Sequence, residues 1–180
     1  MSPYLALLRL NRLARGTMLD IGARDCRISR QFASLGYTVD ALEPFPLPDA
    51  LDEKKRGEAV TLHRTRFEDF RLAEPYDLVI ASLVSQHIRC DLPQFMARLK
   101  FCVKPDGLIY VTLFGDADDW ADKPMVKAVS ADRALQIIAE AGMNPIYRTV
   151  EEYDGPDYSG AQKHWHVFGF VLEATPPPKG

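Results

Sequence analysis

The chain reads TMLDIGARDC over residues 17–26, and this stretch decides the fold class. Residues 17–21 have the composition of a β-strand, and Gly22 follows directly. Apolar residues then recur at helical spacing over residues 28–35, and Gly36 stands where a helix would end. The stretch therefore predicts a strand, a tight turn and a helix, which is the first half of a βαβ unit.

The same alternation continues along the chain. Further strand-like runs lie at residues 38–43, 60–63, 76–81, 108–114, 146–150 and 165–172. Further helical periods lie at residues 92–103 and 131–141, and Ser130 can cap the second of them. Five strand–helix alternations followed by two strands predict an α/β fold. We expect a Rossmann-like, doubly wound, seven-stranded sheet, mostly parallel, with an antiparallel C-terminal edge strand and helices on both faces.

The length of 180 residues fits one domain of ordinary size. We expect a single domain over residues 1–175, with an amphipathic N-terminal helix at residues 1–15 and a disordered tail at residues 176–180. The N-terminal helix can cap a site, cover an edge of the sheet or mediate a dimer, so a monomer and a homodimer both stay open. With so little chain before the first strand, we expect the ligand to be a small molecule, and we expect no separate domain for recognising a macromolecule.

Composition and charge exclude several other classes of protein. Hydrophobic residues make up 47% and charged residues 26%, the balance of a soluble globular domain. A net charge of −3 gives no overall basic field, which argues against a nucleic-acid partner. The uncharged stretch at residues 78–88 is too short to span a membrane. Cys26, Cys90 and Cys102 have no short paired spacing, which suits reduced thiols in a cytoplasmic protein.

The loops after the strands are where a ligand should bind, because doubly wound sheets bind ligands beyond the C-terminal ends of their strands. A nucleotide-binding loop wants glycine at positions 22, 24 and 26, and only Gly22 is present. Glu43 ends the second strand 21 residues after Gly22, a spacing at which a carboxylate reaches the hydroxyls of a ribose. The alternative is a plain βαβ unit with a tight turn and a solvated acid.

Four segments carry a family resemblance. They are LDIG at residues 19–22, GYTVDALE at 36–43, YDLVIAS at 76–82 with QHI at 86–88, and VKPDGLIYV at 103–111. In this order they resemble the class I S-adenosylmethionine (SAM)-dependent methyltransferases. DDW at residues 118–120 and KHWH at residues 163–166 look most like segments of small bacterial tellurite-resistance-type methyltransferases and related methyltransferase-domain proteins.

The resemblance implies SAM as the cofactor, S-adenosylhomocysteine as its product and a donor site at the strand ends. Gly22 and the backbone of Ala23 would lie under the methionine part, and Glu43 would bind the ribose. The loop at residues 66–69 would cover adenine, and Ser82 and Leu83 would lie near the sulfonium. The full set of implied cofactor-binding residues is Asp20, Gly22, Ala23, Arg24, Glu43, Pro44, Arg66, Phe67, Glu68, Ser82 and Leu83.

The sequence departs from the family pattern at three positions. Arg24 and Cys26 replace the second and third glycines, and Arg66 stands where the family usually has an adenine-binding aspartate. SAM has no pyrophosphate, so position 24 tolerates a side chain, and an arginine there could pair with the methionine carboxylate. The alternative is a non-catalytic Rossmann-like binding module with an eroded SAM site. A nicotinamide oxidoreductase is disfavoured because the chain has no Tyr-x-x-x-Lys pair.

On the acceptor side the candidates are His87 as a catalytic base or substrate contact, and Trp120, His164 and His166 as substrate-binding residues. His87 has the alternative of a histidine bonded to backbone at a helix start. The acidic residues around Trp120 favour a cationic or neutral acceptor. No third ligand accompanies the two histidines of the KHWH segment, so we expect no metal. The sequence predicts methyl transfer by in-line displacement to a small molecule.

Overall fold

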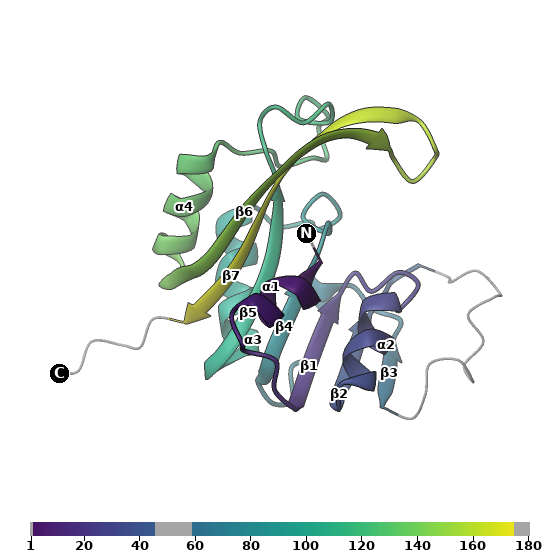
Figure 1. Cartoon of the computed structure of the whole chain (residues 1–180), viewed down its shortest axis with the longest axis vertical. Coiled ribbons are helices and arrows are strands. Elements are labelled where there is room, and N and C mark those ends of the chain that lie inside the picture. Colours follow the sequence, from purple (N-terminus) through teal and green to yellow (C-terminus); the bar gives the residue numbers. More distant parts are fainter. Residues whose placement is uncertain (1, 46–58, 175–180) are drawn as a thin grey trace.

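The computed structural model describes residues 2–45 and 59–174, in which seven strands form one sheet of order β3-β2-β1-β4-β5-β7-β6 (Figure 1). The strands are β1 (Gly16–Ile21), β2 (Tyr37–Leu42), β3 (Val60–His63), β4 (Tyr76–Ala81), β5 (Val103–Phe114), β6 (Met143–Pro156) and β7 (Gln162–Ala174). The helices are α1 (Pro3–Arg9), α2 (Arg27–Ser34), α3 (Leu92–Cys102) and α4 (Ala131–Glu140), and a 3₁₀ turn, η2, spans Phe67–Asp69. The doubly wound, mostly parallel α/β sheet expected from the sequence is confirmed.

The C-terminal strand differs from its expected place. β7 is antiparallel to β5, as expected, but it lies between β5 and β6, so that β6 forms the edge and runs in the direction of the parallel strands. The burial of the two strands explains this order. Residues 167–172 of β7 are buried on both faces, whereas β6 is mostly exposed or half-buried. An apolar strand belongs inside the sheet and a polar one at its edge.

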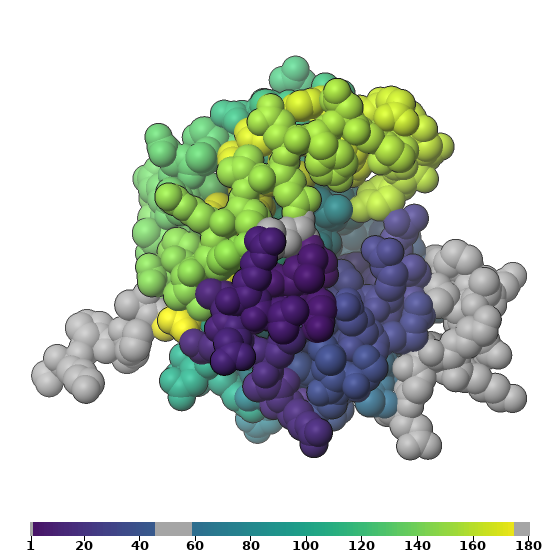
Figure 2. Space-filling model, in the orientation of Figure 1, coloured from purple at the N-terminus to yellow at the C-terminus, as the bar shows by residue number. Residues whose placement is uncertain are grey.

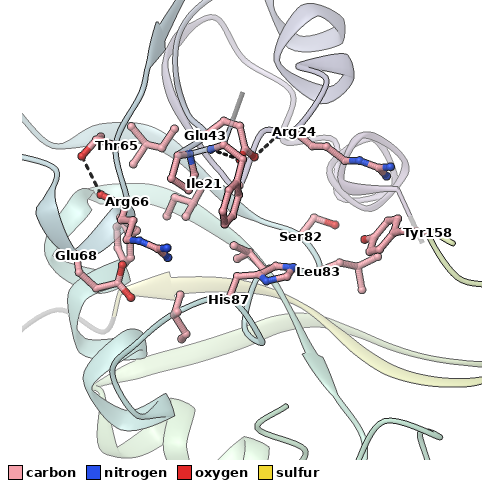
Figure 3. A pocket seen from close by; sticks show the side chains of 17 residues that line it. Ile21, Arg24, Glu43, Thr65, Arg66, Glu68, Ser82, Leu83, His87 and Tyr158 are labelled. Carbon is pink, nitrogen blue, oxygen red and sulfur yellow. Dashed lines mark hydrogen bonds between the residues drawn. The ribbon is translucent and has the colours of Figure 1, made fainter. Parts of the chain in front are cut away.

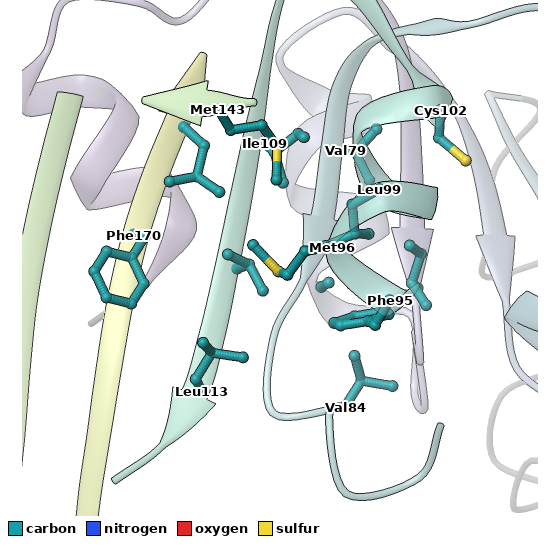
Figure 4. Packing of buried hydrophobic residues seen from close by; sticks show 14 of the residues in the cluster. Val79, Val84, Phe95, Met96, Leu99, Cys102, Ile109, Leu113, Met143 and Phe170 are labelled. Atoms are coloured by element: carbon teal, nitrogen blue, oxygen red, sulfur yellow. The ribbon is translucent and has the colours of Figure 1, made fainter. Parts of the chain in front are cut away.

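Two hydrophobic layers cover the two faces of the sheet. α3 and α4 pack on one face, where Phe95, Met96 and Leu99 of α3 point at Val79 and Ile109 (Figure 4). α1 and α2 pack on the other face, with Leu7 and Phe32 in the second cluster. The helical spacing of Leu92, Phe95, Met96, Leu99 and Cys102 places them on the buried side of α3, as the sequence predicts, whereas Phe101 is exposed.

The N-terminal helix is shorter than expected, and the loop after β3 contains a single short turn. The N-terminal helix ends at Arg9 and not at residue 15, because Asn11 takes a left-handed φ of 52° and turns the chain toward β1. The segment after β3 forms only the 3₁₀ turn η2. The expected tail at residues 176–180 lies outside the described residues.

β6 and β7 are both longer than the sequence indicates. They continue past the end of β5 as a hairpin that arches over the C-terminal edge of the parallel strands (Figure 1). The turn of this hairpin, at residues 157–161, is held by Asp157, whose carboxylate accepts hydrogen bonds from the N–H groups of Ser159 and Ala161. The fold therefore brings a late segment of the chain above the loops that follow β1, β2 and β4.

Candidate functional site

A cavity of about 400 Å³ opens at the C-terminal ends of β1, β2 and β4 (Figure 3). Nine of the eleven cofactor-binding residues implied by the family resemblance line it: Gly22, Arg24, Glu43, Pro44, Arg66, Phe67, Glu68, Ser82 and Leu83. His87 lines it as well. Its volume lies in the range of roughly 300–1,000 Å³ that ligand pockets occupy. The cavity is therefore at the place the topology indicates and is large enough for a nucleoside-sized ligand.

The loop after β1 has the backbone conformation of a glycine-rich loop, although only one of its three key positions is glycine. Gly22, Arg24 and Cys26 have φ angles of 72°, 47° and 54°, so all three are left-handed. This conformation costs a residue other than glycine roughly 1–2 kcal/mol. A Cβ atom at Gly22 would also lie 2.6 Å from Cγ2 of Val84, which makes glycine necessary there. The departures at 24 and 26 thus leave the path of the backbone intact.

Glu43 connects the loops after β1 and β2. Its Oε2 accepts a hydrogen bond from the N–H of Arg24 at 2.9 Å, and its Oε1 accepts one from the N–H of Phe45 at 3.0 Å (Figure 3). Glu43 is only 8% exposed, so it is not a solvated acid, as it would be in a βαβ unit without a ligand site. Each carboxylate oxygen has a second lone pair, and the group can still accept from two hydroxyls of a ligand.

Asp20 and Ala23 do not line the cavity, in contrast to their implied roles. Asp20 lies beneath the loop, 2% exposed, and accepts a hydrogen bond from Ser29 Oγ at the start of α2. Burial raises the pKa of Asp20 to about 6. Ala23 is buried in the core cluster under α2. Both residues support the loop from below. Because side chains alternate along β1, Asp20 points to the face covered by α2, whereas the next residue, Ile21, lines the cavity.

The loop after β3 supplies the outer wall. The Arg66 guanidinium lies 5.6 Å from the centre of the Phe45 ring, and both residues line the cavity. Glu68 also lines it and accepts a hydrogen bond from the N–H of Arg89. Arg98 fixes the loop by donating to the carbonyl oxygens of Phe67 and Phe70 at 2.9 and 2.8 Å. Glu68 is therefore the carboxylate that the loop presents to the cavity.

The turn after β4 closes the inner side. Leu83 is left-handed with a φ of 51°, and its N–H donates to Thr112 Oγ1 on β5 at 2.7 Å. His87 lies in the next turn, where its N–H donates to the carbonyl of Val84 at 2.8 Å. Burial, as the largest cause, lowers the pKa of His87, so that its imidazole is neutral at neutral pH. The ring can then accept a proton from a ligand in the cavity.

Tyr158 is the cavity residue most distant in sequence among those that sequence reasoning missed. It lies at the turn between β6 and β7, and its ring centre is 4.4 Å from Cζ of Arg24. Nothing in the local sequence marks it, because it reaches the cavity only through the length and curvature of the hairpin. Phe45 and Thr65 were also missed, although each comes two residues after a predicted strand and lies beside a predicted residue. The apolar lining residues that were not predicted are Ile21, Leu42, Val84 and Ile88.

The three residues expected on the acceptor side do not line this cavity. Trp120 packs against Trp165 with ring centres 5.6 Å apart. His164 Nδ1 is 2.8 Å from Asp154 Oδ1, which raises the pKa of the histidine, and His166 Nδ1 accepts from the N–H of Ala117. These three side chains, which were expected to bind the acceptor and not SAM, therefore lie outside the cavity implied for SAM.

The DDW and KHWH segments are instead bound to each other. Asp118 pairs with Lys163, and its second carboxylate oxygen accepts from the N–H of His166 at 3.0 Å. Asp119 accepts from the N–H of His164 at 2.6 Å. The side chains of Asp118 and Lys163 are 0% and 4% exposed. Two of the acids expected to face a ligand thus fasten the loop after β5 to β7.

Within residues 2–45 and 59–174, no group of three or more His, Cys, Asp or Glu side chains is arranged to hold a metal ion. None of the helices in the same part of the chain has the length and apolar character needed to cross a membrane.

Comparison with known proteins gives one family match and many structural ones. A family model described as a methyltransferase domain matches residues 1–147, whereas no curated protein matches the chain. The N1-methyltransferase for 1,6-didemethyltoxoflavin of Burkholderia thailandensis, solved with 1,6-didemethyltoxoflavin and S-adenosylhomocysteine bound, is similar in structure. Its TM-score is 0.70 at 16% identity, over 96% of this chain and 76% of that one.

Two further solved structures share the fold. TehB from Haemophilus influenzae has a TM-score of 0.75 at 14% identity, over 97% of this chain and 63% of that one. The N-methyltransferase NodS from Bradyrhizobium japonicum WM9 has a TM-score of 0.70 at 16% identity, over 96% of this chain and 92% of that one.

Proposed function

The chain belongs to the family of methyltransferase domains and is a SAM-dependent methyltransferase, and from this premise we propose that the cavity at the ends of β1, β2 and β4 holds SAM and that the acceptor is a small molecule. The observation that carries the proposal is Glu43. Its buried carboxylate is held at the cavity wall by the N–H groups of Arg24 and Phe45, the place where a ribose diol would be bound.

The residues present fit SAM along the whole cavity. Gly22 leaves room where any Cβ atom would meet Val84, so the backbone there can contact the methionine part. Arg24 lines the cavity with a guanidinium suited to a carboxylate. Phe45 and Phe67 offer apolar faces for adenine, and Glu68 offers an acceptor for its amino group. Asp20 acts from beneath by holding the loop against α2.

Bound SAM supplies an electrophilic methyl group on its sulfonium. Ser82 and Leu83 would border that methyl group, and the fixed turn after β4 would align it with the acceptor. Such alignment replaces a bimolecular encounter with a preorganised one and supplies much of the acceleration of an in-line displacement. His87 would accept a proton from the acceptor, because the lowered pKa keeps its imidazole neutral.

A small-molecule acceptor is supported by two observations. Tyr158, at the turn of the hairpin β6–β7, forms part of the cavity wall, so the site is a pocket and not an extended open surface. The structurally similar enzyme of Burkholderia thailandensis holds 1,6-didemethyltoxoflavin as its acceptor. We further propose one domain over residues 1–175, because the seven strands share one sheet, and a cytoplasmic monomer or homodimer, in keeping with three free cysteines.

The second candidate is a Rossmann-like module that no longer binds SAM. Arg66 is the observation that favours it, because a guanidinium in the cavity cannot accept a hydrogen bond from the adenine amino group. The loop after β1 speaks against it, since Arg24 and Cys26 keep the left-handed backbone of a glycine loop.

Calorimetric titration with S-adenosylhomocysteine tests the proposal. We expect micromolar binding, and we expect Glu43→Ala to weaken it by more than tenfold, about 1.4 kcal/mol. Glu152→Ala is the matched control, because Glu152 is an exposed acid of β6 that does not line the cavity. Thermal unfolding shows whether each variant is folded. No binding at millimolar ligand by folded wild-type protein would favour the module that lost its donor site.

A further inference from the structure

A second cavity adjoins the first at the turn after β4. Its volume is about 640 Å³, and Ser82 and Leu83 line both cavities. Thr112, whose hydroxyl accepts the hydrogen bond from the N–H of Leu83, lines the second cavity. The two cavities are therefore separated by one short turn, and that turn is fixed to the sheet.

The second cavity lies between the hairpin β6–β7 and α2. Tyr153 and Trp165 line it from the hairpin, and their rings stack with centres 6.2 Å apart and an interplanar angle of 14°. Ile28 and Gln31 line it from α2. Figure 2 shows the yellow-green hairpin above the purple N-terminal segment and the blue α2, with a hollow between them. A slot between an aromatic face and a helix face admits a flat molecule.

The acceptor residues expected from the sequence lie beside this cavity. Trp165 lines it, whereas its neighbours His164 and His166 do not, because successive side chains of a strand point to opposite faces. Trp120 packs against Trp165 and does not line it either. The KHWH segment therefore contributes its tryptophan to the wall and not its histidines.

The polar groups of the cavity define what it can recognise. Arg27 and Gln31 of α2 offer hydrogen-bond donors, and Gln31 and the Glu151 carboxylate offer acceptors. Glu151 is the only acid among the lining residues, and a carboxylate disfavours an anionic ligand beside it. A flat ligand that carries an N–H at one edge and a carbonyl or ring nitrogen at another satisfies both kinds of group.

We propose that the second cavity is the acceptor site and that the acceptor is a small, neutral, nitrogen-containing heteroaromatic ring with both donor and acceptor groups on its edge. This inference rests on the proposed function, because it places the acceptor beside the SAM cavity. The half-exposed ring of Tyr153, backed by the buried Trp165, holds the plane of the ligand ring, and Glu151 together with Arg27 sets its orientation in that plane.

The chemical step balances with the groups named. The lone pair of the ring nitrogen forms the new N–CH₃ bond, and the electron pair of the S–CH₃ bond returns to sulfur. The nitrogen then carries a positive charge and loses its proton, which the neutral imidazole of His87 accepts from the side of the first cavity and releases to solvent. The products are the N-methylated ring, S-adenosylhomocysteine and one proton.

Calorimetric titration with lumazine, a neutral pteridinedione at slightly acidic pH, tests the inference on protein saturated with S-adenosylhomocysteine. We expect saturable binding. Glu151→Gln removes the charged acceptor and Tyr153→Ala removes the aromatic face, so each variant should weaken the binding about tenfold or more. Both variants should keep the wild-type affinity for S-adenosylhomocysteine, because neither residue lines the first cavity.

The adjacent acid of β6 supplies the matched control. Glu152→Gln changes an exposed residue that lines neither cavity, and its affinity for lumazine should equal that of the wild type. Benzoate, a flat anion without an N–H group, should not bind. If S-adenosylhomocysteine binds and lumazine does not, or if benzoate binds as well as lumazine, the acceptor inference is wrong while the proposed function stands. If S-adenosylhomocysteine itself does not bind, the proposed function fails first.

Discussion

The Arg24 guanidinium lies 4.4 Å from the centre of the Tyr158 ring, and this contact joins the first loop of the sheet to the tip of the hairpin β6–β7 across the donor cavity. The two residues are 134 positions apart in the chain, and both line the cavity. The hairpin is thus part of the donor site as well as the wall of the second cavity. The tip of the hairpin covers the loop after β1, in which Arg24 and Cys26 stand in place of glycines.

Removal of the Tyr158 ring should open the donor cavity. We expect Tyr158→Ala to weaken the binding of S-adenosylhomocysteine several-fold, because a cation–π contact at an exposed site contributes about 0.5–1 kcal/mol and the ring also shields the ligand. Calorimetry measures the change. Tyr158→Phe keeps the ring and should bind as the wild type does. An equal loss in both variants would assign the effect to the hydroxyl and contradict the role of the ring.

The backbone strain at position 24 can be measured by comparing two truncations. Arg24→Gly and Arg24→Ala remove the same guanidinium, but only glycine relieves the left-handed φ of 47°. We expect the glycine variant to have a free energy of unfolding about 1 kcal/mol above that of the alanine variant. Urea denaturation gives both values. Equal stabilities would mean that the loop relaxes when the side chain is lost.

Burial of Asp20 predicts a stability that depends on pH. The pKa of Asp20 is raised from 3.8 to about 6 in the folded protein, so the folded state binds more protons than the unfolded state between these values. Asp20 therefore contributes stability at low pH that is lost as the pH rises from about 4 to about 6. Relative to wild type, Asp20→Asn should gain about 1–3 kcal/mol of unfolding free energy over that interval.

A second carboxylate provides the opposite control for this experiment. The hydrogen bond from Lys104 lowers the pKa of Asp77, so its contribution is present above the unfolded pKa and is lost as the pH falls. Asp77→Asn should therefore lose stability relative to wild type as the pH rises. Denaturation curves across the acidic range give both signs, and a gain for both variants would contradict the assignment of Asp20.

The buried pair of Asp118 and Lys163 should respond more strongly to single than to double substitution. Lys163→Met leaves the Asp118 carboxylate buried without its cation, and we expect a loss of about 3–5 kcal/mol in unfolding free energy. The double variant Asp118→Asn/Lys163→Met removes both charges and should recover at least about 1 kcal/mol. Urea denaturation of the single and double variants measures the coupling, and strict additivity would show that the pair is not coupled.

Local periodicity was sufficient to predict most of the sheet and its helices. The spacing of apolar residues in α3 and the capping residue Ser130 of α4 act within one element, and the structure confirms both. Glu43 lines the cavity, as the length of one βαβ unit indicates, and its contact with the ribose stays a prediction. Features of this kind are encoded by neighbours in sequence.

The features that the sequence did not reveal depend on distant parts of the chain. Tyr158 reaches the donor cavity only because β6 and β7 extend past β5 and curve together. The position of β7 inside the sheet depends on the burial of both its faces by other elements. The role of Asp118 likewise follows from pairing with a strand that comes 45 residues later.

The turn at Ser82 and Leu83 separates the proposed donor site from the proposed acceptor site. On the proposed assignment, the donor is held chiefly by loops of the parallel strands, whereas the aromatic wall for the acceptor comes from a hairpin at the far end of the chain. Residues 151–153 and 165–167 can therefore vary while the loops that hold SAM stay the same. In evolutionary terms, substitutions in the hairpin can change the acceptor while the loops that bind SAM are retained.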